Sequence, residues 1–129
     1  QAYIETLEKL FVLKVVPLIS PRGKILHRKN KKVHLTDPFI ARALARYVRA
    51  RIEEPQLLES LVACQLARKF EVFYWRNKSE VDVVVVENGK QIGVEIKTRA
   101  GSWKRPRHLG KSFLLKKADL ALFLASMKL

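Results

Sequence analysis

The stretch of sequence that decides the fold runs from residue 80 to residue 97 and reads EVDVVVVENGKQIGVEIK. Four consecutive valines are typical of a strand that is covered on both faces, and Asn88-Gly89 is typical of a tight hairpin turn. We therefore expect an antiparallel hairpin in which Glu87 faces Lys90. Counting outward from that pair, Asp82 faces Glu95.

Four charged side chains stand in this apolar hairpin, and the register predicts that they share one face of the sheet: Glu80, Asp82, Glu95 and Lys97. Two opposed carboxylates destabilise a sheet by about 0.2–1 kcal/mol, so a cation between them would make sense of the arrangement. Mg²⁺ prefers such hard oxygen ligands, and Lys97 could orient a water or stabilise charge on a phosphate. The alternative is a solvated face on which Lys97 forms ion pairs with Glu80 and Glu95.

The hairpin lies within a longer alternation of helices and strands. In chain order, we expect a helix over 55–69, strands over 71–76, 80–86 and 91–97, a basic loop over 101–110, a helix over 108–117 and a strand over 118–125. The predicted fold class is therefore α/β, with an α-β-β-β-α-β core over residues 55–129.

The residues before this core suggest two further segments. A helix over 3–13 and short strands at 15–19 and 33–35 resemble the end of a winged helix, which we assign to residues 1–36. Asp37-Pro38 is typical of a helix start, and residues 37–54 are assigned to a basic connecting helix. Such a helix could lie on DNA or on an anionic membrane, or its basic face could simply be solvated.

The charge of the chain indicates a polyanionic partner. It carries 26 Lys and Arg against 12 Asp and Glu, which gives a net charge of +14 and a pI near 10.3. Residues 1–55 hold 12 basic and 5 acidic side chains, residues 56–97 hold 6 of each, and residues 98–129 hold 8 and 1. The excess therefore lies in two flanks around the acidic hairpin, and we expect the partner to be DNA.

Several basic residues and one aromatic residue are the candidates for contacting that DNA. Trp103 stands among cations directly after the hairpin, which suits phosphate contact together with base stacking, although it could equally cap the edge of the core. The predicted nucleic-acid-binding residues are Arg99, Trp103, Lys104, Arg105, Arg107, Lys111, Arg42 and Arg46.

Other features limit the remaining function classes. The single Cys64 excludes an internal disulfide and a cysteine-rich zinc site, and it favours a reducing, cytoplasmic setting. No apolar stretch is long enough to span a membrane, so no membrane partner is expected. His27, His34 and His108 share no ligand spacing and are interpreted as polar surface residues. Because the first residue is not Met, we expect a piece of a longer protein.

The order Asp82, then Glu95-Ile96-Lys97, resembles the D…(D/E)-x-K signature of the PD-(D/E)XK nuclease superfamily. The resemblance implies a restriction-endonuclease-like core in which Asp82 and Glu95 hold Mg²⁺ or Mn²⁺ and Lys97 positions a water. It also implies that Glu59, a helical acid at the border of an apolar face, completes the site and reaches toward Asp82. Val81 stands where the superfamily has its proline. Residues 95–99 also resemble archaeal Holliday-junction resolvases.

A closer resemblance covers nearly the whole chain. The segments that carry it are KVHLTDPF at 32–39, ESLVA at 59–63, FYWR at 73–76, EVD at 80–82 and EIK at 95–97. They are similar to the uncharacterised nuclease-like C-terminal domain of archaeal and bacterial AAA-type ATPases. The likeness implies an N-terminal ATPase domain as a partner. Because no G-x-x-x-x-G-K-[ST] motif occurs, ATP is not expected to bind these residues.

Together these observations predict a DNA-binding, Mg²⁺-dependent phosphodiester hydrolase module of an ATPase. The alternative is a catalytically silent domain of that ATPase that binds DNA or another protein. The oligomeric state stays open.

Overall fold

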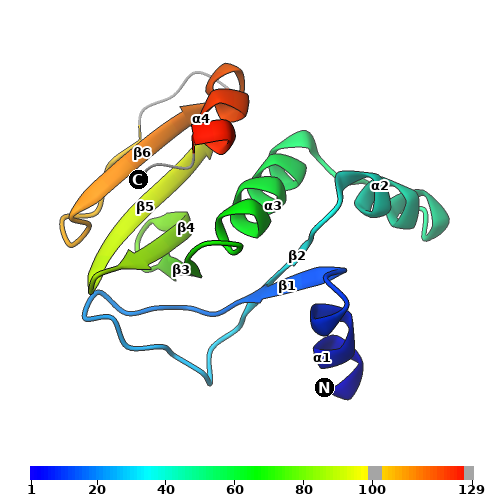
Figure 1. Ribbon diagram of the computed structural model, residues 1–129, viewed down its shortest axis with the longest axis horizontal. Helices are drawn as coiled ribbons and strands as arrows, with labels where there is room; N and C mark the ends of the chain where they lie inside the picture. Colours follow the sequence, from blue (N-terminus) through cyan, green and yellow to red (C-terminus); the bar gives the residue numbers. More distant parts are fainter. Residues whose placement is uncertain (99–102, 127–129) are drawn as a thin grey trace.

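The Asn88-Gly89 turn forms as predicted. Both residues have positive φ angles, 50° and 73°, as a tight hairpin turn of this kind requires. Strand β4 (Glu80–Glu87) therefore pairs antiparallel with β5 (Lys90–Lys97), with Glu87 opposite Lys90 and Val83 opposite Val94. The computed structural model describes residues 1–98 and 103–126. In it, the hairpin forms the two central strands of the larger of two sheets (Figure 1).

That sheet has four strands and is mixed. Strand β3 (Glu71–Arg76) pairs antiparallel with β4, and β6 (Lys111–Lys116) pairs parallel with β5, so that the order is β3-β4-β5-β6. Helix α3 (Glu54–Leu66) lies against one face of it. The described part of the chain thus forms a mixed α/β fold.

Both faces of the valine run are buried, as the sequence predicts. On one face the helix-side core joins α3 to the sheet and includes Val62, Leu66, Val83, Val85, Val94 and Ile96. On the other face the loop-side core consists of Ile19, Phe73, Trp75, Val81, Val84 and Leu109. No helix covers this second face in the described residues; the segments around Ile19 and Leu109 cover it instead.

A bulge interrupts β4 between Val81 and Val84. Phe73 pairs with Val84, but Trp75 pairs with Val81, so three steps along β4 match two along β3. As a result, Val81 lies in the loop-side core while Val83 lies in the helix-side core. The strict alternation from which we placed Asp82 and its neighbours on one face therefore does not hold along this strand.

The last two predicted elements are wrong. The predicted helix at 108–117 is strand β6, and the predicted strand at 118–125 is a 3₁₀ turn, η1 (Lys117–Asp119), followed by helix α4 (Leu120–Ser126). Short apolar runs do not distinguish a strand from a helix by periodicity. Here β6 forms because the edge of β5 is free to pair, and α4 forms from Ala and Leu, which are strong helix formers. The described core order is therefore α-β-β-β-β-α.

The N-terminal segment forms a helix, a small sheet and a second helix. Helix α1 (Ala2–Lys9) ends earlier than predicted, and β1 (Leu13–Val16) pairs antiparallel with β2 (Lys32–Leu35). Helix α2 (Pro38–Tyr47) begins as predicted, because the Asp37 carboxylate accepts a hydrogen bond from the Phe39 N–H at 2.8 Å. Strand β2 also contacts α3, which brings the N-terminal segment against the core (Figure 1).

Among the described residues, the helices are all too short or too polar for a membrane crossing.

One position in the sheet predicts a clear effect on stability. A Cβ atom on Gly93 would lie 2.5 Å from Leu109 Cδ1 and 3.3 Å from Val81 Cγ1, inside the loop-side core. We expect Gly93→Ala to lower the free energy of unfolding by about 1–3 kcal/mol through overpacking, measured by urea denaturation. Gly110→Ala is the matched control, because its Cβ would meet only the Gln91 carbonyl oxygen at 3.8 Å. Equal stability of the two variants would contradict this packing.

Candidate functional site

Four elements, namely β2, α3, β4 and β5, meet where β4 begins and β5 ends. Strand β4 contributes Glu80 and Asp82, β5 contributes Glu95 and Lys97, and the middle of α3 contributes Glu59. The structure thus brings together the predicted acids and the predicted lysine. It arranges them in two groups that share Asp82.

The first group surrounds a lysine that the sequence did not single out. Lys32 Nζ lies 2.8 Å from Glu59 Oε1 and 3.4 Å from Asp82 Oδ1, and it also pairs with the carboxylate of Glu80. Its side chain is only 19% exposed and lies over the ring of Tyr74. Burial alone would lower the pKa of Lys32, but hydrogen bonds to Glu59 and Glu80 raise it well above its usual value. This ammonium is therefore a fixed positive charge within the acidic group.

The second group is centred on a buried carboxylate. Glu95 is 6% exposed, its Oε2 accepts a hydrogen bond from the Asp82 N–H at 3.4 Å, and its Oε1 lies 3.3 Å from Lys97 Nζ. Burial, followed by the nearby Asp82 carboxylate, raises the pKa of Glu95 to about 6. Burial and the Glu59 carboxylate likewise raise the pKa of Asp82. The protein thus holds carboxylates together that would separate if they were free to move.

The prediction for Glu59 agrees with the structure, because its carboxylate faces the same ammonium as Asp82. The interpretation of His34 as a surface residue is wrong. His34 is buried, its Nδ1 lies 2.8 Å from Ser60 Oγ, and its Nε2 lies 3.9 Å from Glu59 Oε1. Burial, and then the charge of Lys32, lower the pKa of His34 to about 4, so the ring is neutral near pH 7.

The sequence analysis assigns no role to Lys32, although Lys32 and His34 both belong to the segment at 32–39 that carries the closer family resemblance. Lys32 is one of several cations in the run over 28–32, and only the pairing of β1 with β2 directs it toward Asp82, 50 residues further along the chain. His34 follows two residues later on the same strand.

The donor chemistry of these residues suits Mg²⁺ or Mn²⁺, which prefer carboxylate oxygens. Within residues 1–98 and 103–126, however, no set of three or more His, Cys, Asp or Glu side chains is arranged to hold a metal ion. The arrangement in the structure is a group of carboxylates around the ammonium of Lys32, with Glu95 paired to Lys97 beside it.

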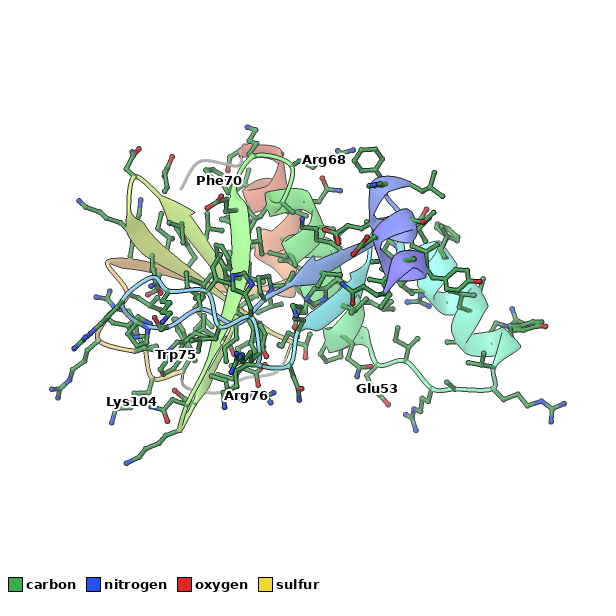
Figure 2. All side chains as sticks on the ribbon, turned by 90° about the horizontal axis from the view of Figure 1, so that it is seen from below. Glu53, Arg68, Phe70, Trp75, Arg76 and Lys104 are labelled. Atoms are coloured by element: carbon green, nitrogen blue, oxygen red, sulfur yellow. The ribbon has the colours of Figure 1, made fainter. Side chains whose placement is uncertain are left out.

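The predicted nucleic-acid-binding residues occupy two separate surfaces. Lys104, Arg105, Arg107 and Lys111 are exposed in and after the segment that precedes β6, and Arg42 and Arg46 are exposed on α2. Figure 2 shows Lys104 projecting away from the ribbon. In Figure 1, α2 and β6 lie at opposite ends of the molecule. Arg99 lies outside the described residues.

The position of Trp103 favours the interpretation that it caps the edge of the core over the interpretation that it stacks on a base. It is partly buried and packs against the loop-side core, which places it at the edge of that core. Its Nε1 is buried and has no hydrogen-bond partner among the described residues.

Comparison with known proteins identifies one family. The family model described as "Domain of unknown function (DUF4143)" matches residues 54–125, from the start of α3 into α4. This match includes every residue of the two groups above except Lys32, and it does not reach His34. No curated protein and no solved structure matches the chain. Because the matched residues make up more than half of its length, the chain belongs to the DUF4143 family.

Proposed function

We propose that this domain binds DNA and hydrolyses phosphodiester bonds with the help of a divalent metal ion, through a PD-(D/E)XK-like site. Asp82 and Glu95 would hold Mg²⁺ or Mn²⁺, Glu59 would assist, and Lys97 would position the attacking water. The observation that carries the proposal is the burial of the Glu95 carboxylate beside Lys97 and Asp82. A carboxylate that is 6% exposed, paired with Lys97 and next to Asp82, is costly to bury unless its charge has a use.

The order of the strands supports the same proposal. A helix followed by three antiparallel strands, with the two acids of the signature where the second and third strands meet, is what the superfamily resemblance implies. Here the fourth strand follows without the expected intervening helix in the described residues. A restriction-endonuclease-like core thus belongs to the proposal, with that departure.

The chemistry can be assigned residue by residue. A bound Mg²⁺ would acidify a water and stabilise charge on the phosphate and on the leaving oxygen. The ammonium of Lys97, which lies 3.3 Å from Glu95 Oε1, would contact that water or a nonbridging oxygen. Burial of Glu95 would strengthen the electrostatic interactions of its carboxylate with a bound metal ion.

The proposed domain context of this module, and its partner, follow from the same family resemblance. We propose that an AAA-type ATPase domain precedes this module in a longer protein and is its partner. The single, buried Cys64 fits a cytoplasmic location for such a protein.

DNA binding should depend strongly on salt. The logarithm of affinity should fall against the logarithm of salt concentration with a slope of about −0.9 per phosphate neutralised. We expect replacement of Lys104, Arg105 and Arg107 by Ala to weaken binding and flatten that slope, measured by fluorescence anisotropy. Replacing Lys9, Arg68 and Lys69 removes the same charge elsewhere and serves as the control. If the two triple variants bind alike, the segment before β6 does not contact DNA.

The direct experiment is incubation of the protein with labelled linear and branched DNA. We expect weak cleavage with Mg²⁺ or Mn²⁺ and none with Ca²⁺ or a chelator. If neither DNA is cut with Mn²⁺ at high protein concentration, the proposal fails for this domain.

A second candidate function is a catalytically silent module that binds DNA or a protein. It is favoured by Lys32, whose ammonium already pairs with the carboxylates of Glu59, Glu80 and Asp82 and so takes the place among them that a metal ion would occupy. In that case the acids and Lys32 would hold the N-terminal segment against the core. DNA affinity unaffected by divalent ions, together with absent cleavage, would support this alternative.

A further inference from the structure

A second candidate site lies at the far end of the β4–β5 hairpin. A cavity of about 680 Å³ is lined by the turn at 88–89, the loop around Gly23 and the residues that lead into β6. Asp82 and Glu95 lie five residues from Glu87 and Lys90, the pair that flanks the turn, which corresponds to about 17 Å along the strands. The cavity is therefore separate from the acidic groups.

The electrostatics of this cavity favour an anion. Its lining includes the exposed cations Arg22, Lys90 and Lys111, against the single carboxylate of Glu87. Within the described residues, none of these three cations forms an ion pair. Three cations from three separate segments thus line one cavity without a carboxylate bound to any of them, and the ammonium of Lys111 lies 5.2 Å from the centre of the Phe113 ring. Such a lining is typical of a phosphate-binding surface.

The cavity also has polar groups with unused hydrogen-bonding capacity. Gln91 is 7% exposed, and its Nε2 donates to the carbonyl oxygens of Ser20 at 2.8 Å and Pro21 at 3.3 Å. This fixes the orientation of the amide, and its Oε1 is left as an acceptor with no partner among the described residues. His108, which also lines the cavity, has a buried Nε2 without a partner in the same part of the chain.

The volume of the cavity sets an upper limit on the size of a ligand. A volume of about 680 Å³ is within the ordinary range for small-molecule sites and far exceeds what a phosphate ion needs. Ile92 and Pro21 add apolar wall to it. The ligand class that fits is thus a phosphate attached to an organic body that carries an N–H or O–H donor for Gln91.

We propose that this cavity binds a nucleoside monophosphate unit. The phosphate lies among Arg22, Lys90 and Lys111, and a donor of the base or sugar reaches Gln91 or His108. The unit could be a free nucleotide or the phosphorylated end of a nucleic-acid strand, since both present the same chemistry. The site does not depend on the proposed cleavage activity.

The test is isothermal titration calorimetry with three probes: deoxyadenosine 5′-monophosphate, deoxyadenosine and inorganic phosphate. We expect the nucleotide to bind at least about tenfold more tightly than either of its parts, because it uses both the cations and the polar wall. Equal binding of nucleotide and deoxyadenosine, or no binding of the nucleotide, would overturn the proposal.

Substitutions locate the binding. Arg22→Ala and Lys111→Ala change exposed side chains, so the fold should persist, and each should weaken nucleotide binding about tenfold. Lys78→Ala, in the exposed turn between β3 and β4, is the control and should bind normally. Glu95→Gln should also bind normally, which separates this proposal from the proposed hydrolase. If Arg22→Ala and Lys111→Ala both match the control, the cavity is not the site.

Two further arms distinguish the sources of the ligand. A short oligonucleotide with a 5′-phosphate is compared with the same strand ending in a 5′-hydroxyl. Tighter binding of the phosphorylated strand, lost in Arg22→Ala, identifies strand ends as a ligand. Equal binding of both strands, alongside tight binding of the mononucleotide, identifies the free nucleotide. If neither strand end nor mononucleotide responds to Arg22→Ala, the proposal is wrong.

Discussion

Replacing Glu95 by glutamine is expected to abolish Mg²⁺- and Mn²⁺-dependent DNA cleavage, with a loss of at least about 100-fold. The substitution keeps the size of the side chain but removes the negative charge that would hold the metal ion beside Asp82. DNA affinity should change little, because the basic surfaces lie elsewhere in the chain. Cleavage is measured on labelled DNA at saturating protein, and affinity is measured with Ca²⁺ so that the DNA is not cut.

Glu87→Gln is the matched control for this experiment. Glu87 belongs to the same hairpin and is exposed next to the turn, so its replacement should leave cleavage unchanged. Lys97→Ala tests the source of the activity. If Lys97→Ala cleaves as fast as the unmodified protein, the site is assigned wrongly or a contaminating nuclease produces the signal.

The largest effect on stability is expected from Lys32→Met. Without the ammonium, the carboxylates of Glu59, Glu80 and Asp82 lose their shared cation while they stay partly buried. Breaking such a group is costly, and after allowance for partial exposure we expect a loss of about 2 kcal/mol or more in the free energy of unfolding. Urea denaturation in a chelator measures this loss.

Millimolar Mn²⁺ should restore much of that stability if the carboxylates form a cation site, because a ligand that binds only the folded state stabilises it. Lys31→Met is the control, since Lys31 is exposed and, within the described part of the chain, donates only to the His27 carbonyl oxygen. A Lys32→Met protein that is destabilised yet indifferent to Mn²⁺ would favour the silent module. A Lys32→Met protein as stable as the control would contradict the ion-pair group itself.

The sequence predicts local structure well where one turn decides it. Asn88-Gly89 fixes the register of β4 and β5, and the predicted pairing is confirmed from Glu87–Lys90 as far as Val83–Val94. The bulge between Val81 and Val84 could not be predicted from the sequence, because it depends on how β3 pairs with β4 rather than on a particular residue in β4. The same applies to β6, which is a strand because β5 offers an edge for parallel pairing.

In the candidate site, too, the residues that local patterns connect could be predicted, and the residue that arrives through tertiary contacts could not. A spacing and a family resemblance connect Asp82, Glu95, Lys97 and Glu59, and this was enough to predict that they lie near one another. Lys32 reaches them from a different sheet, and no local pattern marks one lysine in a basic run as the buried one. The acids could thus be predicted, whereas the charge that organises them required tertiary structure.

The position of Lys32 also has a consequence for the order of folding. The β4–β5 hairpin closes a loop of a few residues, but the contact between Lys32 and Asp82 joins positions 50 residues apart. Closing a long loop costs more chain entropy, so such contacts form slowly and late. We expect the acidic residues to come together first as a strained, mutually repelling group. Docking of the N-terminal segment would then relieve that repulsion and complete the native state.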